Sequence, residues 1–254
     1  LYINIFGKIT MNIFITGASS GIGESLAYYY AQKGATIGLV ARREDRLKAV
    51  VEKVKELGGN PISYILDVAN QEDVQKATSS FLEQAERIDM VIANAGVGGS
   101  DNLSSGNAST INKILSINIL GVTNTVIPFI PSMKEQKSGQ ICIISSIAGT
   151  RGLIGHGGYS GSKAAVRLLG DSWDYSLSRH NISTTVVSPG WIATEMTARH
   201  TFKMLFLMDS ETAAGKIANA IEKRKRKYIL PWQWNIIVPI FRFLPRWMIK
   251  LVSV

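Results

Sequence analysis

The sequence predicts an α/β fold: a single domain built on a doubly wound parallel sheet of about seven strands, with helices on both faces. Short apolar runs rich in β-branched residues recur along the 254-residue chain and indicate buried strands. Helix-length segments of mixed charge separate these runs, and such alternation implies right-handed crossovers between parallel strands. The hydrophobic content of 46% and the charged content of 19% suit one sizeable core.

The strands are expected, in chain order, at residues 12–17, 36–42, 61–68, 89–96, 139–146, 183–190 and 227–231. The clearest helices between them are expected at 42–57 and 71–86. In this architecture ligands bind beyond the carboxyl ends of the strands, so chemistry is expected where each apolar run ends. We assign residues 11–231 to this domain, residues 1–10 to an N-terminal extension of uncertain meaning, and residues 232–254 to an apolar and basic tail.

Composition narrows the function classes. The only cysteine, Cys142, lies in an apolar run, which suits a reducing compartment, and the three histidines show no spacing typical of a metal site. Much of the formal charge of +9 comes from the run KRKRK at 223–227, which we interpret as a solvated helix end and not as a nucleic-acid surface. With no signal-peptide pattern at the start, we expect a cytoplasmic protein without metal or nucleic acid.

The stretch TGASSGIG at 16–23 follows the first expected strand and begins a helix. Gly17 permits a tight turn, Gly21 lets the backbone approach a pyrophosphate, and Gly23 allows close helix packing, as in a Rossmann-type dinucleotide site. The residues of this turn expected to bind the cofactor are Gly17, Ser19, Ser20, Gly21, Ile22 and Gly23.

The same letters contain G-A-S-S-G, the pattern of a serine hydrolase elbow. Ser19 follows the first strand, however, so nothing upstream can supply an oxyanion loop. His200 and several aspartates lie downstream in a workable order. Hydrolysis through Ser19 therefore remains the weaker alternative to cofactor binding.

The second strand ends in Ala41, Arg42 and Arg43, where an NAD enzyme usually carries an acidic residue for the adenosine ribose. An arginine fork pairs well with a 2′-phosphate, so we expect NADP as cofactor, with NADPH preferred over NADH. The alternative is that the two arginines simply begin a charged helix.

Five motifs together resemble the short-chain dehydrogenase/reductase family, from about residue 12 to residue 231. They are TGASSGIG at 16–23, NAG at 94–96, SSIAG at 145–149, YSGSK at 159–163 and PGWIAT at 189–194, and they stand in the order of that family.

Tyr159 and Lys163 are four residues apart, so on a helix they share one face. The resemblance implies that Tyr159 is the general acid in carbonyl reduction and the general base in the reverse direction. A nearby Lys163 ammonium favours the phenolate, so we expect it to lower the pKa of Tyr159. Lys163 would also hold the nicotinamide ribose.

The resemblance also implies two supporting polar groups. Family spacing selects Ser146 over Ser145 to orient the substrate carbonyl and stabilise its developing negative charge. Asn118 matches the asparagine that supports a water bridging toward the lysine, with a capping or helix-kinking amide as its alternative.

The remaining cofactor contacts are implied by the same resemblance. Ala93 stands where the family has a first asparagine, which puts a secondary contact in doubt. The cofactor contacts that the resemblance implies are Asp67 and Val68 beside the adenine, Asn94, Ala95 and Gly96 at the end of the fourth strand, and Pro189, Gly190, Ile192 and Thr194 near the nicotinamide carboxamide.

The substrate is expected to be a carbonyl compound or an alcohol. The apolar segment 202–208 favours a hydrophobic molecule such as a lipid, steroid or acyl chain, although core packing explains the same letters. The tail 232–254 suits a peripheral membrane contact, a lid or a subunit contact. The family forms dimers and tetramers, so a homo-oligomer is expected. A dinucleotide-binding regulator without turnover is the alternative function.

Overall fold

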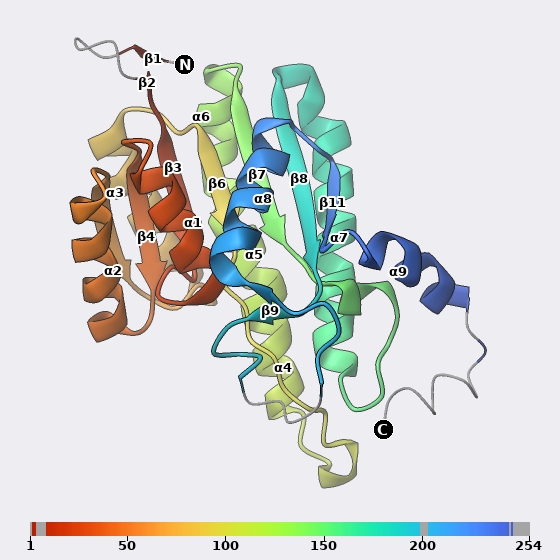
Figure 1. The fold of residues 1–254 in the computed structure, drawn as a ribbon. Coiled ribbons are helices and arrows are strands. Elements are labelled where there is room, and N and C mark those ends of the chain that lie inside the picture. Colours follow the sequence, from red (N-terminus) through yellow and green to blue (C-terminus); the bar gives the residue numbers. More distant parts are fainter. Residues whose placement is uncertain (1, 4–8, 199–202, 244, 246–254) are drawn as a thin grey trace.

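The computed structural model describes residues 2–3, 9–198, 203–243 and 245, and its centre is a seven-stranded sheet (Figure 1). All strand pairs in this sheet are parallel, and the strand order is β5-β4-β3-β6-β7-β8-β11. The strands are β3 (Asn12–Thr16), β4 (Thr36–Ala41), β5 (Asn60–Ile65), β6 (Met90–Ala93), β7 (Gly139–Ile144), β8 (Ile182–Pro189) and β11 (Lys227–Leu230). The predicted fold class is confirmed, and the strand order reverses between β3 and β6, where such folds bind ligands.

Two short strand pairs lie outside this sheet. β1 (Tyr2–Ile3) pairs with β2 (Ile9–Thr10) in antiparallel fashion, within the stretch expected to be an N-terminal extension. β9 (Ile192–Ala193) pairs in parallel with β10 (Met208–Asp209). The second pair joins the two ends of the stretch that contains the apolar segment 202–208.

Helices cover both faces of the sheet, and each face has its own apolar core. One core joins the sheet to α1 (Gly21–Ala31), α2 (Glu44–Glu56) and α8 (Ser210–Glu222). The other joins it to α3 (Gln71–Ala85), α7 (Gly157–Leu177) and a long helix at 109–135. Alternation along β3 shows the cause, because Ile13 and Ile15 enter the first core while Phe14 enters the second.

The long helix consists of α4 (Ser109–Leu115), a π-helical segment (Ser116–Leu120), α5 (Gly121–Val126), a 3₁₀ turn (Ile127–Phe129) and α6 (Ile130–Glu135). Within the described residues it is the one helix whose length and composition would allow it to cross a membrane. In this fold, 44% of its most apolar window is buried inside the protein. It serves here as a core helix of the second layer.

The tail contains α9 (Trp234–Phe243), which lies beside β11 at the edge of the sheet (Figure 1). Two basic residues of this tail, Arg246 and Lys250, lie outside the described residues. The basic run at 223–227 follows α8 and is exposed, with Arg226 paired to Asp174 and Lys227 to Asp171.

Candidate active site

The glycine turn between β3 and α1 is as tight as the sequence predicts. Gly17 and Gly21 have positive φ angles of 68° and 60°. A Cβ on Gly23 would lie 2.4 Å from the backbone oxygen of Gly17, so no larger residue fits there. Ser20, at the N-cap of α1, makes no side-chain cap hydrogen bond, which leaves the first N–H groups of this helix to a ligand. These features fit the phosphates of a dinucleotide.

Asn94 holds this turn against the end of β6. Its side-chain amide donates to the backbone oxygens of Thr16 (3.0 Å) and Gly17 (3.1 Å). Ala95 lies so close that a Cβ on Gly17 would meet its Cα at 2.8 Å. The predicted residues Asn94 and Ala95 therefore lie directly beside the glycine turn.

Both predicted arginines directly follow β4 and pair with carboxylates. Arg42 contacts Asp67 at 3.1 Å, and Asp67 also accepts a hydrogen bond from the Ala69 N–H. Arg43 donates to the Ser20 hydroxyl at 2.9 Å, so it lies over the glycine turn. The sequence alone does not reveal that Arg43 lies over the glycine turn. It shows only that Arg43 begins a charged helix, and Arg43 is the N-cap residue of α2.

Tyr159 and Lys163 lie on the first turns of α7, with the Lys163 Nζ 5.9 Å from the centroid of the Tyr159 ring. The Lys163 side chain is buried, and its Nζ donates a 2.9 Å hydrogen bond to the carbonyl of Ile144, where β7 ends. The Ser146 hydroxyl lies close enough to the Tyr159 hydroxyl to act on its pKa. The three predicted catalytic side chains therefore converge at the carboxyl end of β7.

One electrostatic expectation is wrong for the protein in this state. Burial raises the pKa of Tyr159, and the nearby Ser146 hydroxyl offsets only part of this. Burial also lowers the pKa of Lys163 to about 8, because desolvation disfavours the ammonium. Sequence reasoning counted the attraction between the two groups and missed the desolvation that packing imposes on both.

Asn118 lies in the π-helical segment and is fully buried. Its Oδ1 accepts from the Val97 N–H (2.8 Å), while its Nδ2 donates to the Val97 oxygen (2.9 Å) and to Ser162 Oγ (3.0 Å). A Cβ on Gly96 would lie 3.2 Å from Asn118 Oδ1 and 3.3 Å from Lys163 Nζ. Asn118 thus belongs to the same polar cluster as Lys163.

The remaining predicted residues lie at or after the carboxyl ends of β5 and β8. Pro189 ends β8, Ile192 begins β9, and the methyl group of Thr194 lies 2.8 Å from a Cβ built on Gly21. Val68 is buried and its carbonyl accepts from Asn124. The described part of the chain therefore brings the predicted cofactor residues to the carboxyl ends of the strands.

The comparisons with known proteins agree with this geometry. The family model described as short chain dehydrogenase matches residues 11–204. The chain belongs to the short chain dehydrogenase family. It is an NAD(P)-dependent oxidoreductase of that family, and its resemblance to the family is thereby confirmed.

Individual relatives match over most of the chain. An "uncharacterized oxidoreductase" of Myxococcus xanthus (strain DK1622) is 32% identical over 91% of both chains. An "11-beta-hydroxysteroid dehydrogenase-like 2" of Arabidopsis thaliana is 36% identical, over 91% of this chain and 75% of the relative. Among solved structures, an alcohol dehydrogenase from the archaeon Thermococcus sibiricus, complexed with 5-hydroxy-NADP, is 26% identical, with a TM-score of 0.78 and coverage of 87% and 96%.

Three side chains that sequence reasoning missed support this short chain dehydrogenase site. Asp101 accepts hydrogen bonds from the Gly158 N–H through both carboxylate oxygens, at 3.2 and 3.0 Å, and so fixes the start of α7. Trp234 of α9 packs so closely on Gly190 that a Cβ there would lie 2.2 Å from its indole nitrogen. Glu195 pairs with Arg43. All three contacts join distant segments, which explains why no local pattern predicts them.

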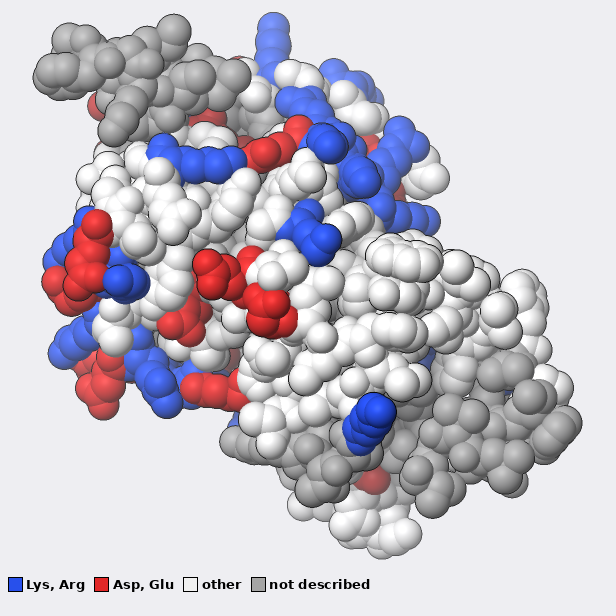
Figure 2. All heavy atoms as spheres, viewed as in Figure 1, with Lys and Arg blue, Asp and Glu red and all other residues white. Residues whose placement is uncertain are grey.

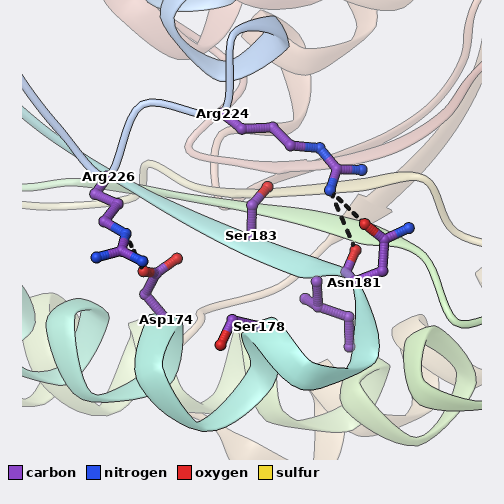
Figure 3. A pocket seen from close by; sticks show the side chains of 7 residues that line it. Asp174, Ser178, Asn181, Ser183, Arg224 and Arg226 are labelled. Atoms are coloured by element: carbon purple, nitrogen blue, oxygen red, sulfur yellow. Dashed lines mark hydrogen bonds and ion pairs between the residues drawn. The ribbon is translucent and has the colours of Figure 1, made fainter.

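Two other places do not match the catalytic geometry. Ser19, the nucleophile of the hydrolase alternative, has its hydroxyl 3.4 Å from Arg43, while His156 bonds the Gly99 oxygen and His200 lies outside the described residues. Figure 3 shows a polar hollow in which Asp174 pairs with Arg226 and Arg224 with Asn181. This hollow lies at the amino ends of β8 and β11, whereas Tyr159 lies near the carboxyl ends of the strands.

Proposed function

We propose that this protein is an NADP(H)-dependent oxidoreductase that interconverts a carbonyl group and an alcohol, with NADPH as the preferred reductant. The observation that carries the proposal is the convergence of Ser146, Tyr159 and Lys163 beside the glycine turn and the uncapped start of α1. A binding protein without turnover would not need all three side chains. The alternative is a dinucleotide-binding regulator, which would bind the cofactor without turning over a substrate.

In this mechanism the dinucleotide, when bound, supplies the hydride that reaches the carbonyl carbon. Ser146 donates a hydrogen bond to the substrate oxygen and stabilises the negative charge that develops there. Tyr159 transfers its hydroxyl proton to that oxygen, which completes the alcohol, and takes the proton back in the reverse reaction. Lys163 holds positive charge beside Tyr159, which favours the phenolate that proton transfer leaves.

Asn118 positions this group in the proposal. Its Oδ1 lies in the same small space as Lys163 Nζ, and its amide bonds to Ser162, whose hydroxyl donates to the Tyr159 carbonyl at 2.7 Å. These bonds fix the turn of α7 that carries both Tyr159 and Lys163. We propose that Asn118 also supports a water that connects to Lys163.

The preference for NADPH rests on Arg42 and Arg43. Both guanidinium groups lie at the end of β4 where the adenosine ribose binds in this fold, and they can pair with a 2′-phosphate. Fluorescence titration with NADPH and NADH tests this preference. Tighter binding of NADH would refute it.

Turnover is best tested by NADPH oxidation against aldehydes and ketones of increasing apolar chain length, with Tyr159→Phe as the blank. Rates that rise with chain length are expected, because the substrate side carries exposed apolar residues of the segment before β10: Met196, Leu205, Phe206 and Leu207. The described part of this segment supports a lipid-, steroid- or acyl-like substrate. Absence of turnover with every carbonyl compound, despite NADPH binding, would favour the regulator.

We also propose that α9 makes a peripheral membrane contact in an otherwise cytoplasmic protein. Ile236, Ile240 and Phe243 recur at helical spacing on α9, Trp232 stands just before the helix, and all four are exposed. Figure 2 shows a broad surface over α9 and the neighbouring segment on which charged side chains are nearly absent. Arg151 donates a 3.0 Å hydrogen bond to the Phe241 oxygen, which joins this helix to the segment after Ser146.

Liposome co-sedimentation of the full chain tests the membrane contact. Ile236→Ser should reduce binding to vesicles of anionic phospholipid severalfold, because it removes apolar area from the contact. Ile65→Ser is the matched control, since Ile65 is exposed to 54%, against 59% for Ile236, and lies in β5 at the other edge of the sheet. Equal binding of both variants would reject the contact.

A homo-oligomer, a dimer or tetramer, is proposed for the face formed by the long helix and α7. Leu120, Ile127, Leu168 and Tyr175 are large apolar side chains exposed on these neighbouring helices. Light scattering of wild type and Leu168→Lys tests this, with a lower mass expected for the variant. A monomeric wild type would refute it.

A further inference from the structure

Arg43 bridges two segments that lie far apart in the sequence. Its NH1 contacts the Glu195 carboxylate at 2.6 Å, across a separation of 152 residues. Its NH2 bonds the hydroxyls of Ser20 (2.9 Å) and Ser19 (3.4 Å) in the glycine turn. Arg43 therefore binds the glycine turn through its NH2 group and the Glu195 carboxylate through its NH1 group.

Glu195 reaches this position because of how its segment is anchored. The preceding residue, Thr194, packs its methyl group against Gly21, and its N–H bonds the Thr197 hydroxyl at 2.9 Å. The following residue, Met196, reaches toward Gly98 on the opposite wall. The carboxylate is thus held over the glycine turn, at the adenosine end of the cofactor site.

The charges in this region decide what the contact does. Arg42 is paired with Asp67, and Arg46 lies 3.5 Å from the second oxygen of Glu195. A 2′-phosphate that binds Arg43 therefore has to share this arginine with Glu195 or displace the Glu195 carboxylate from it. The Arg43 and Glu195 side chains are each 47% exposed, so the pair is solvent-screened and can be exchanged.

We propose that Glu195 is a specificity-determining residue: it competes with the 2′-phosphate of the cofactor for Arg43 and so sets the discrimination between phosphorylated and unphosphorylated dinucleotides. The inference rests on the proposed role of Arg43 in NADPH binding. A carboxylate over this site repels the phosphate as well as occupying its partner, and both effects act against NADPH while leaving NADH largely unaffected.

Adenosine fragments test this without turnover. The intact protein is titrated by calorimetry with 2′,5′-ADP and with 5′-AMP, which differ in the 2′-phosphate. Glu195→Gln is expected to tighten binding of 2′,5′-ADP about two- to fivefold, the range expected for exposed ion pairs, with 5′-AMP changed less than about twofold. In the Arg43→Ala background the same substitution should tighten 2′,5′-ADP less, because competition for Arg43 is lost and only the repulsion between carboxylate and phosphate remains.

Glu44→Gln is the matched control. It removes the same charge one residue from Arg43, but Glu44 pairs with Lys48 at 2.8 Å. If Glu44→Gln tightens 2′,5′-ADP as much as Glu195→Gln does, the effect is general electrostatics and the inference is wrong. An unchanged affinity in Glu195→Gln also overturns it.

The two proposals fail in different ways. If wild type binds 5′-AMP as tightly as 2′,5′-ADP, the NADPH preference fails, and the inference that rests on it fails with it. If wild type prefers 2′,5′-ADP but Glu195→Gln does not strengthen this preference, only the role of Glu195 is refuted. Glu195→Ala, like Glu195→Gln, should tighten binding of 2′,5′-ADP and change that of 5′-AMP little.

Discussion

The Nζ of Lys163 donates its hydrogen bond to the backbone carbonyl of Ile144, so an ionisable amine of α7 is tied to the last residue of β7. The lysine is only 5% exposed. Its charged form is thus removed from water and is compensated there by a neutral carbonyl oxygen. The lowered pKa of Lys163, about 8, is the consequence.

This pKa predicts how stability depends on pH. Between about pH 8 and the ordinary value of 10.5, the unfolded chain binds a proton that the folded protein does not, so stability rises with pH. Below about pH 8 both states are charged and the full cost of burial is present. A difference between 10.5 and about 8 corresponds to about 3 kcal/mol.

Lys163→Met isolates this contribution. The free energy of unfolding of wild type, from urea titrations at pH 7.5, 8.5 and 9.5, should rise relative to that of the variant as pH increases, because other groups titrate alike in both proteins. The difference between the two proteins is the quantity to follow. A difference that stays constant over this range would show that Lys163 is not desolvated as described.

Much of the fold follows from local sequence. The strand expected at 36–42 is observed at Thr36–Ala41, and the helix expected at 71–86 at Gln71–Ala85, because apolar runs and capping residues act over short distances. Asn70 illustrates this, since its side chain accepts from the Glu72 and Asp73 N–H groups at the start of α3.

Motif order and spacing predict which side chains the structure brings together, but they predict the energetics of these side chains less well. Tyr159 and Lys163 share a helix face by spacing alone, but the direction of the Tyr159 pKa depends on how many apolar groups pack around it. The π-helical segment at Asn118 and the Arg43–Glu195 pair also arise from tertiary contacts. No local pattern specifies either one.

Tyr159→Phe should lower turnover about 100- to 10,000-fold, the usual contribution of a general acid, because the ring remains and only the proton donor is lost. Binding of NADPH should stay within about twofold of wild type, since the proposed cofactor site consists chiefly of the glycine turn and the two arginines. Steady-state rates and a fluorescence titration measure the two effects. Near-normal turnover would remove Tyr159 from the proposed mechanism.

The two adjacent serines provide a matched comparison. Ser146→Ala should lower kcat about 100- to 1,000-fold, because Ser146 would stabilise charge only as it develops. Ser145→Ala removes a 2.7 Å hydrogen bond from Ser145 Oγ to the Lys163 carbonyl, and it should cost about 1 kcal/mol of stability with a smaller effect on kcat. If the two variants lose activity equally, the assignment of Ser146 over Ser145 is wrong.

Asn118→Ala tests whether the buried amide positions the catalytic helix. The change breaks bonds to both polar groups of Val97 and to Ser162, so we expect a loss of about 2–4 kcal/mol in the free energy of unfolding. Because the Ser162 contact fixes the turn that carries Tyr159 and Lys163, kcat should also fall while KM for NADPH changes little.

Asn124→Ala is the control from the same long helix, since its side-chain amide donates a 2.9 Å bond to the Val68 carbonyl. It should destabilise the protein by about 1 kcal/mol and leave kcat near that of wild type. Urea unfolding gives the stability of both variants, and steady-state kinetics at saturating NADPH gives kcat. A fall in kcat that merely follows the loss of stability across the two variants would make Asn118 a structural residue, whereas a fall confined to Asn118→Ala supports its positioning role.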